Sequence, residues 1–168
     1  MYFTKKHFWI LPCAVALIFS GCSKNASDKL SIEKNVENDV IITENGQKYE
    51  AHVTNVPEGI TSVAFKTPEN LASVTFEYKN GKYIISSKEL SGEYNLNPLE
   101  KNAIFSKIMD VFGAIGASEN IKVDSKGDNS LVFKIKTENS EYKILADKDG
   151  KILLIENPDE NFKVEFKV

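Results

Sequence analysis

The stretch KILLIENPDENFKVEFKV, residues 151–168, decides the fold that we expect for this chain. From Phe162 to Val168, apolar and polar residues alternate strictly, which is typical of a β-strand with one buried and one solvated face. Residues 157–161 combine Asn, Pro and Asp and predict a turn, so the stretch forms a hairpin. Residues 152–155 are all apolar, and this run predicts a central strand that is covered on both faces.

Further hairpins are predicted upstream. An Asn-Gly pair between two extended runs is the strongest short signal for a β-hairpin, and it occurs twice, within residues 40–53 and within residues 73–86. Residues 60–66 predict a strand between these hairpins, ended by Pro68. Three later segments also predict strands: 120–124, 131–136 and 142–146.

The turn before residue 151 resembles part of a calcium loop. Asp147, Asp149 and Glu156 match three of its acidic positions around a glycine, but Leu145 stands where the first ligand belongs. Because this segment lies between two alternating runs, we interpret it as a hairpin turn. The sequence predicts no metal site and no cofactor.

One helix interrupts the strands. Asn97 is suited to cap it, Pro98 suits its first position, and Glu100 completes a capping box. The helix is predicted to run to about residue 115, with two glycines framing its end. Its apolar stripe should lie on the sheet and consists of Leu99, Ala103, Phe105, Ile108, Met109, Phe112 and Ile115. Its polar positions are Lys101, Asn102, Lys107 and Asp110.

The N-terminal segment has the order of a secretory signal peptide: Lys5 and Lys6 precede an apolar run over residues 8–19. The run is shorter than the roughly 20 residues that a membrane-spanning helix needs. It ends in FSGC, residues 19–22, which resembles the lipobox of bacterial lipoproteins although Phe19 stands where leucine is usual. That resemblance implies cleavage between Gly21 and Cys22 and diacylglycerol on Cys22. An uncleaved anchor and an ordinary signal peptide are the alternatives.

Loss of the signal peptide would remove one of the two cysteines and one of the two histidines. Cys13 and His7 lie within it, which leaves no free thiol and only His52. Cysteine nucleophiles, cysteine-rich zinc sites and multi-histidine metal sites are therefore excluded. His52 is in phase with Glu50 on a strand, so we expect it to face solvent. The chain has a formal net charge of −3 and no arginine, which argues against nucleic-acid binding.

Residues 48–168 resemble the LolA/LolB-like superfamily of lipoprotein carriers. The resemblance is carried by the strand-Pro-strand passage of residues 63–78 and by the closing passage of residues 142–166, after a lipobox and a polar tether. It implies a strongly curved, incomplete antiparallel barrel whose apolar concave face lies under a helical lid and accommodates acyl chains. The carriers use an arginine to close the cavity, and this chain has none. Its lysine-rich composition is typical of a low-GC Gram-positive source, in which an outer-membrane shuttle has no destination.

The aromatic residues can be interpreted in two ways. They could line an apolar ligand cavity, or they could fill a solid core, because alternation places the same residues inward in both cases. The candidate lining residues are Phe65, Phe76, Tyr78, Tyr83, Phe105, Met109, Phe112, Phe133, Tyr142, Phe162 and Phe166.

We therefore expect an α+β fold of mainly antiparallel β structure, a curved incomplete barrel with one principal amphipathic helix on its concave face. Residues 1–21 form the signal peptide, residues 22–38 the lipid anchor and polar tether, and residues 39–168 the folded domain. The expected function is that of a non-enzymatic lipoprotein on the extracytoplasmic face of the cell membrane, with a lipid or other apolar ligand. The alternative is a cell-envelope interaction or sensing module with a solid core and a protein partner.

Overall fold

The computed structural model describes residues 31–57, 59–88, 91–94, 103–118, 121, 123–127, 129–138 and 140–167. These residues form strands, one α-helix and one short 3-10 helix: β1 (Val36–Glu44), β2 (Gln47–Val56), β3 (Ile60–Thr67), β4 (Thr75–Lys79), β5 (Lys82–Ser86), β6 (Ser91–Tyr94), α1 (Ile104–Ala117), β7 (Val123–Lys126), β8 (Ser130–Lys136), β9 (Glu141–Asp147), β10 (Ile152–Asn157), η1 (Pro158–Glu160) and β11 (Phe162–Phe166).

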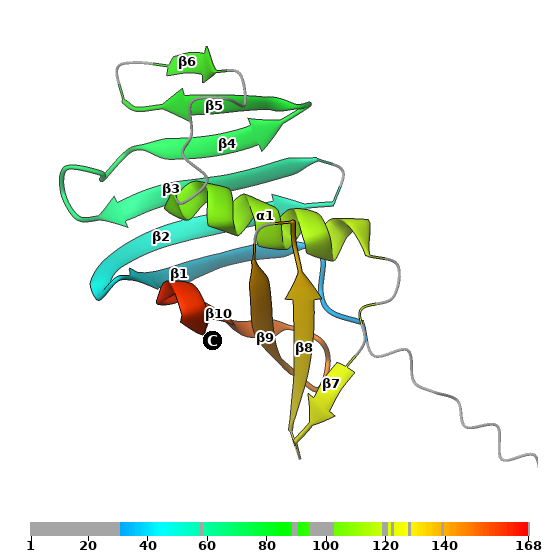
Figure 1. The fold of residues 1–168 in the computed structure, drawn as a ribbon. Helices are drawn as coiled ribbons and strands as arrows, with labels where there is room; N and C mark the ends of the chain where they lie inside the picture. The colour runs from blue at the N-terminus through cyan, green and yellow to red at the C-terminus, as the bar shows by residue number, and fades with distance from the viewer. Residues whose placement is uncertain are drawn as a thin grey trace, which may run out of the picture.

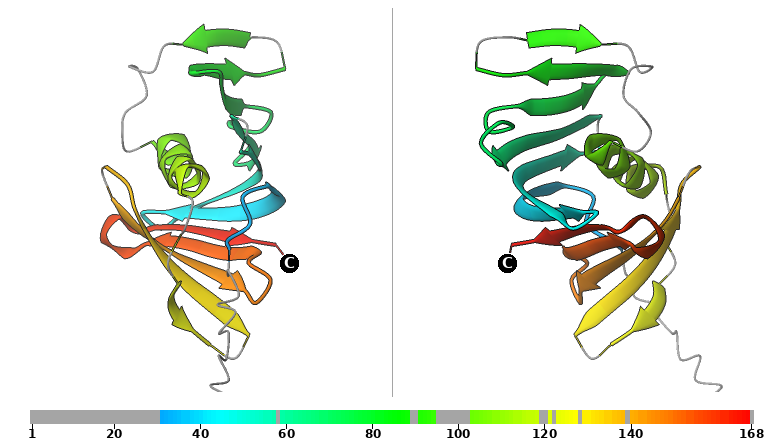
Figure 2. Two further views of the ribbon diagram at one scale, coloured as in Figure 1. Left: turned by 90° about the vertical axis from the view of Figure 1, so that its right-hand side faces the viewer. Right: turned by 60° about the vertical axis from the view of Figure 1, so that its left-hand side comes forward.

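All described strands belong to one antiparallel sheet, in the order β6-β5-β4-β3-β2-β1-β11-β10-β9-β8-β7. Two meanders, β1 to β6 and β7 to β11, are joined where β1 pairs with β11, with Val40 opposite Phe166. The edge strands β6 and β7 do not pair with each other, so the sheet stays open. It curves around α1, which lies on the concave face (Figures 1 and 2). The predicted fold class is confirmed.

Turn chemistry fixes the hairpins as expected. Asn45 and Gly46 both have positive φ, 49° and 83°, as a type I′ turn requires, and β1 and β2 pair on either side of them. Asn80 and Gly81 repeat this geometry between β4 and β5. The turn before residue 151 is also a hairpin turn, in which the Asp147 carboxylate accepts hydrogen bonds from the backbone N–H groups of Asp149 and Lys151.

The run over residues 152–155 does not form a strand covered on both faces. Ile152 and Ile155 are buried, whereas Leu153 and Leu154 remain half-buried. The pairing of β10 with β9 shifts register between Ile152 and Leu154. This bulge lets two residues oppose one on the partner strand, so both isoleucines reach the same face although they are three residues apart. The apolar run therefore reflects a bulge, and the prediction of double cover was wrong.

The helix begins later and ends later than expected. Ala103 has an extended backbone and precedes the first helical residue, Ile104, and the helix continues through both of its glycines to Ala117. The expected cap at residues 97–100 lies outside the described residues, as do Leu99, Lys101 and Asn102. The stripe is also broader than predicted, because Val111 and the charged Lys107 are buried with it.

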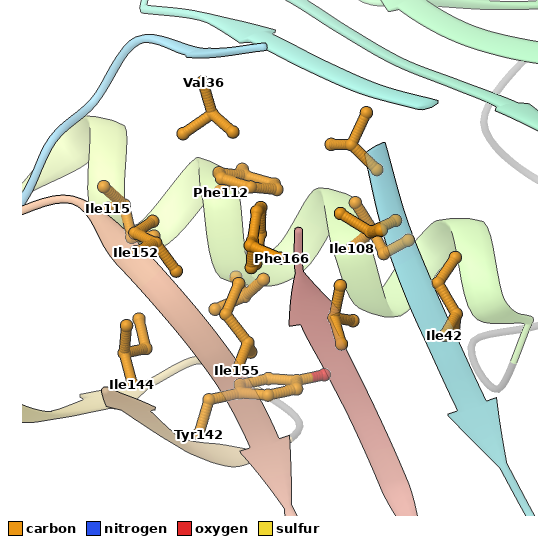
Figure 3. Close-up of a cluster of buried hydrophobic side chains, with 14 of the residues drawn as sticks. Val36, Ile42, Ile108, Phe112, Ile115, Tyr142, Ile144, Ile152, Ile155 and Phe166 are labelled. Carbon is orange, nitrogen blue, oxygen red and sulfur yellow. The ribbon is translucent and has the colours of Figure 1, made fainter. Parts of the chain in front are cut away.

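The core fills the space between α1 and the concave face. Ile108, Phe112 and Ile115 of α1 point toward Ile152 and Phe166 of the sheet (Figure 3). Burial of one such side chain stabilises the fold by about 1.5–3 kcal/mol. The amphipathic helix is thus an integral layer of the core.

Ordered packing begins before residue 39, the expected start of the domain. β1 starts at Val36, and Ile32 is only 4% exposed. The Glu33 N–H donates to the Gly150 carbonyl at 2.8 Å, and the Ser31 carbonyl oxygen lies so close to Gly150 that a Cβ there would be 2.1 Å from it. We call residues 31–35 the strap. Two buried apolar residues, Ile32 and Val36, hold the C-terminal part of the expected tether on the domain.

Candidate functional site

The structure places all the candidate lining residues in the core or packed against it. A first aromatic group spans β3 to β5 and reaches the helix through Phe105, whose ring centroid lies 5.3 Å from that of Phe76 and 5.7 Å from that of Tyr83. Phe65 continues the group beside Phe76, at 5.9 Å, and Tyr78 beside Tyr83, at 5.1 Å.

A second group lies on the other side of the junction between the meanders. Tyr142 and Phe162 meet edge to face at 6.2 Å, and Phe133 and Phe166 are buried nearby in the same core. Burial raises the pKa of the Tyr142 hydroxyl, which is consistent with a packing role. These four side chains fill the core at this end of the sheet.

An apolar groove of about 350 Å³ opens beside the C-terminal half of α1. It is bounded by the end of β2, the turn into β3, and β4. Its lining consists of Asn55, Val56, Pro57, Gly59, Thr61, Tyr78, Met109, Phe112, Gly113, Gly116 and Ala117. Three of the candidate lining residues are among these, Tyr78, Met109 and Phe112; the others are not. None of the described lining residues is charged.

The groove exists because α1 lacks side chains at this point. Gly113, Gly116 and Ala117 are exposed, and a Cβ added at either glycine would meet nothing within 4 Å. Two glycines in one helix cost about 1 kcal/mol each relative to alanine, so their presence is a signal in itself. The sequence interpretation took them as the end of the helix and missed their place in the groove.

The side chains of Asn55 and Thr61 in the groove wall are hydrogen-bonded to each other. Asn55 is 5% exposed, accepts a hydrogen bond from the Thr61 hydroxyl at 2.8 Å, and donates to the Lys34 carbonyl at 2.7 Å. Lys34 in turn donates from Nζ to the carbonyls of Gly116 and Ser118 at 3.1 and 2.9 Å. A cation there complements the negative end of the helix dipole. The strap thus ties the groove rim to the end of α1.

Near its N-terminus, α1 is fixed to the sheet by a buried ion pair. Lys107 Nζ lies 2.8 Å from Glu44 Oε1 and 3.0 Å from Glu160 Oε2, and its side chain is only 7% exposed. Burial lowers the pKa of Lys107, but the hydrogen bonds to both glutamates outweigh burial and leave that pKa raised. Hydrogen bonds from Ser140 and Lys107 lower the pKa of Glu160 against the effect of burial. The helix is therefore held at both ends.

His52 lies away from the groove. Its Nδ1 is 2.8 Å from Asp39 Oδ1, which also accepts a hydrogen bond from Lys66 at 2.6 Å. The bonds from Lys66 and His52 lower the pKa of Asp39 to about 2. His52 is half-exposed, and Asp39 and Glu37, the carboxylates near its ring nitrogens, lie outside the groove lining. Within the described residues, no three His, Cys, Asp or Glu side chains gather as a metal site would require.

Comparison with known proteins yields similar structures only. No family model matches the chain, and no curated protein matches it. Among solved structures, a domain from Vibrio parahaemolyticus whose name assigns it to outer membrane lipoprotein sorting has a TM-score of 0.44 and 13% identity over 82% of this chain and 72% of its own. An uncharacterized conserved protein from Thermus thermophilus has a TM-score of 0.42 and 12% identity over 83% and 81%. A LolA superfamily protein from Nitrosomonas europaea has a TM-score of 0.37 and 10% identity over 80% and 70%.

Proposed function

We propose that this protein is a lipoprotein, held on the extracytoplasmic face of the cell membrane by acylated Cys22, that binds an acyl chain of a lipid and catalyses no reaction. The observation that carries the proposal is the groove beside α1, which is apolar and lacks charged lining residues in the described chain. A site of this kind favours an apolar ligand, because the side chains of Asn55 and Thr61 in its wall are already paired within the protein.

Membrane attachment is supported by the sequence of residues 19–22. No described helix is long and apolar enough to cross a membrane. Two acyl chains on one cysteine would hold the protein stably, since each buried methylene contributes about 0.8 kcal/mol and one chain alone binds only marginally. Growth with radiolabelled palmitate tests this: we expect label on the chain, and none on a Cys22→Ser variant.

Filling the groove tests ligand binding. Gly113→Phe places a ring in open space on a helix that tolerates a side chain, so the fold should persist while the groove closes. We expect Gly113→Phe to lose most of the binding of a fluorescent fatty acid, and Gly113→Ala, which adds one methyl group, to keep it. Thr43→Phe, on β1 away from the groove, is the control for a larger surface. Equal binding by all three variants would refute the groove as the site.

A solid interaction module is the second candidate, because most of the candidate lining residues pack in the core rather than around the groove. Its sheet offers two open edges, β6 and β7, for a protein partner. Two results together would favour this candidate: the protein takes up no fatty acid or phospholipid, and its binding to a protein partner is lost by substitutions in β7 but not at Gly113.

A further inference from the structure

We infer that the groove end of the domain faces the membrane that carries the anchor, and that the bound acyl chain belongs to a lipid of that membrane. This inference rests on the proposed function, and it deepens that function by naming the source of the ligand and the surface that meets it. Three observations support it: the place where the strap leaves the domain, the reach of the chain toward Cys22, and the exposed side chain at the groove rim.

The strap passes the groove wall within three residues of the point where the described chain begins. The Lys34 carbonyl accepts a hydrogen bond from Asn55 in the groove wall, and the Lys34 ammonium group donates one to the carbonyl of Gly116 on α1. Three residues earlier, Ser31 packs on the turn at Gly150. Figure 1 shows the start of β1, the turn from β2 into β3 and the C-terminal end of α1 on the same side of the molecule. The described chain therefore begins on the side of the molecule that carries the β2–β3 turn and the C-terminal end of α1, two of the elements that line the groove.

The length of chain between Cys22 and Ser31 limits how the anchored domain can be oriented relative to the membrane. Cys22 precedes Ser31 by nine residues, which span at most about 30 Å when fully extended. The opposite end of the domain, at Gln47, is separated from Val56 by the length of β2, about 30 Å for a strand of this length. Turning Gln47 toward the membrane would use the whole reach of these nine residues. The orientation with the groove toward the bilayer needs less of it, because the strap already contacts the groove wall at Lys34.

The rim carries a side chain suited to a lipid surface. Val56 ends β2, lines the groove and is 39% exposed. Among the described residues, it is the one large hydrophobic side chain that is exposed. Lys34, the basic residue of the strap, donates hydrogen bonds from its ammonium group to the carbonyls of Gly116 and Ser118 at the end of α1. The described lining residues of the groove carry no charge, so this apolar tip can approach the headgroup boundary with little loss of charge hydration from those residues. Val56 would then offer an acyl chain an apolar contact at the entrance to the groove.

Two single-cysteine labels test the orientation in the full lipidated chain. The acylated thiol of Cys22 does not react and Cys13 leaves with the signal peptide, so Val56→Cys or Gln47→Cys provides one reactive thiol. Each variant is labelled with bimane and reconstituted into phosphatidylglycerol–phosphatidylcholine vesicles that contain a headgroup nitroxide lipid. Because β2 separates the labels by about 30 Å, we expect loss of at least half of the fluorescence at position 56 and almost none at position 47.

Equal quenching at the two positions, or stronger quenching at position 47, would overturn the inference even if the protein binds acyl chains. Quenching at position 56 in a chain that takes up no fatty acid would support the orientation and refute the proposed ligand instead. A chain that does not float with the vesicles would refute the anchor, and the inference with it.

The strap and the occupant have their own controls. Gly150→Ala would drive a Cβ into the Ser31 carbonyl, and Lys34→Gln removes the charge that holds the helix end. We expect each to reduce the difference in quenching between the labels, and retention of the full difference in both would overturn the role of the strap.

A photoreactive acyl chain in the vesicle lipid should label the groove. A groove that it never labels, because the protein's own acylated Cys22 or a second copy fills it, would overturn the bilayer as the source.

Discussion

Lys107→Met is the substitution whose effect follows most directly from the structure. It keeps the unbranched apolar stem and removes the ammonium group that lies 2.8 Å from Glu44 and 3.0 Å from Glu160. Removing one partner of a fully buried ion pair costs about 3–5 kcal/mol. Here Glu44 keeps 15% and Glu160 31% of side-chain exposure, so water recovers part of the loss. We therefore expect a loss of about 2–4 kcal/mol in the free energy of unfolding.

Lys163→Met is the matched control. Lys163 and Glu165 are also 2.8 Å apart, but their side chains are 41% and 45% exposed. The same substitution should cost less than about 1 kcal/mol there, because exposed ion pairs contribute little. Lys107–Glu44 and Lys163–Glu165 have the same distance, so a difference between the variants measures the combined effect of burial and of the second glutamate partner of Lys107, Glu160.

Urea unfolding followed by circular dichroism distinguishes the variants. With a slope of about 1–3 kcal/mol per molar urea, the Lys107→Met midpoint should fall by about 1–2 M. Adding Glu44→Gln and Glu160→Gln removes the unpaired charges and should restore part of the loss. A Lys107→Met midpoint no lower than that of Lys163→Met would refute the reasoning that this pair fixes α1 to the sheet.

Two further predictions concern single positions. Gly113→Ala should raise the free energy of unfolding by about 0.5–1 kcal/mol, because the new methyl group meets open space on a helix. Gly46→Ala should lower the free energy of unfolding by about 1–2 kcal/mol, because its φ of 83° disfavours any L side chain. Thermal unfolding of both variants checks these opposite signs. The Asp39 carboxylate, whose pKa is lowered to about 2, stabilises the fold above its usual pKa of 3.8, and this contribution is lost as pH falls through about 2. Asp39→Asn should therefore have a flatter acid-unfolding curve below pH 4, and an unchanged curve would contradict the role of its bonds to Lys66 and His52.

Features governed by neighbouring residues could be predicted from the sequence. The Asn45-Gly46 turn specifies a hairpin because only a few residues adopt positive φ at both positions, and the alternation after Phe162 places one face of β11 in the core. The class of fold follows from the succession of such hairpins around one amphipathic helix.

Features governed by distant partners could not be predicted. Lys107 looks like a surface residue because the glutamates that pair with it lie on β1 and η1. The strap looks like a polar tether because its burial depends on the turn at Gly150. The bulge at Leu153 can be predicted only when the pairing of β10 with β9 is known. Sequence periodicity describes one element at a time, and these contacts exist only between elements.

The groove itself was only partly predictable. Met109 and Phe112 were expected near a ligand because they are apolar and inward-facing, but the same criterion selected residues such as Phe133 that fill the core. What distinguishes the groove is the missing side chains at Gly113 and Gly116 together with the β2–β3 turn opposite them. An empty volume of this kind depends on what faces the glycines across the fold, which the sequence pattern alone does not reveal.

The most direct measurement of the central claim is photocrosslinking in cells. Cells that express the full chain are grown with a diazirine fatty acid that enters their lipids, irradiated, and the protein is digested and analysed by mass spectrometry. We predict acyl adducts on the peptides that carry Val56, Tyr78, Met109 and Phe112, and their loss in the Gly113→Phe variant. Adducts confined to other faces of the sheet, or equally abundant groove adducts in Gly113→Phe, would contradict the assignment of the groove as an acyl-chain site.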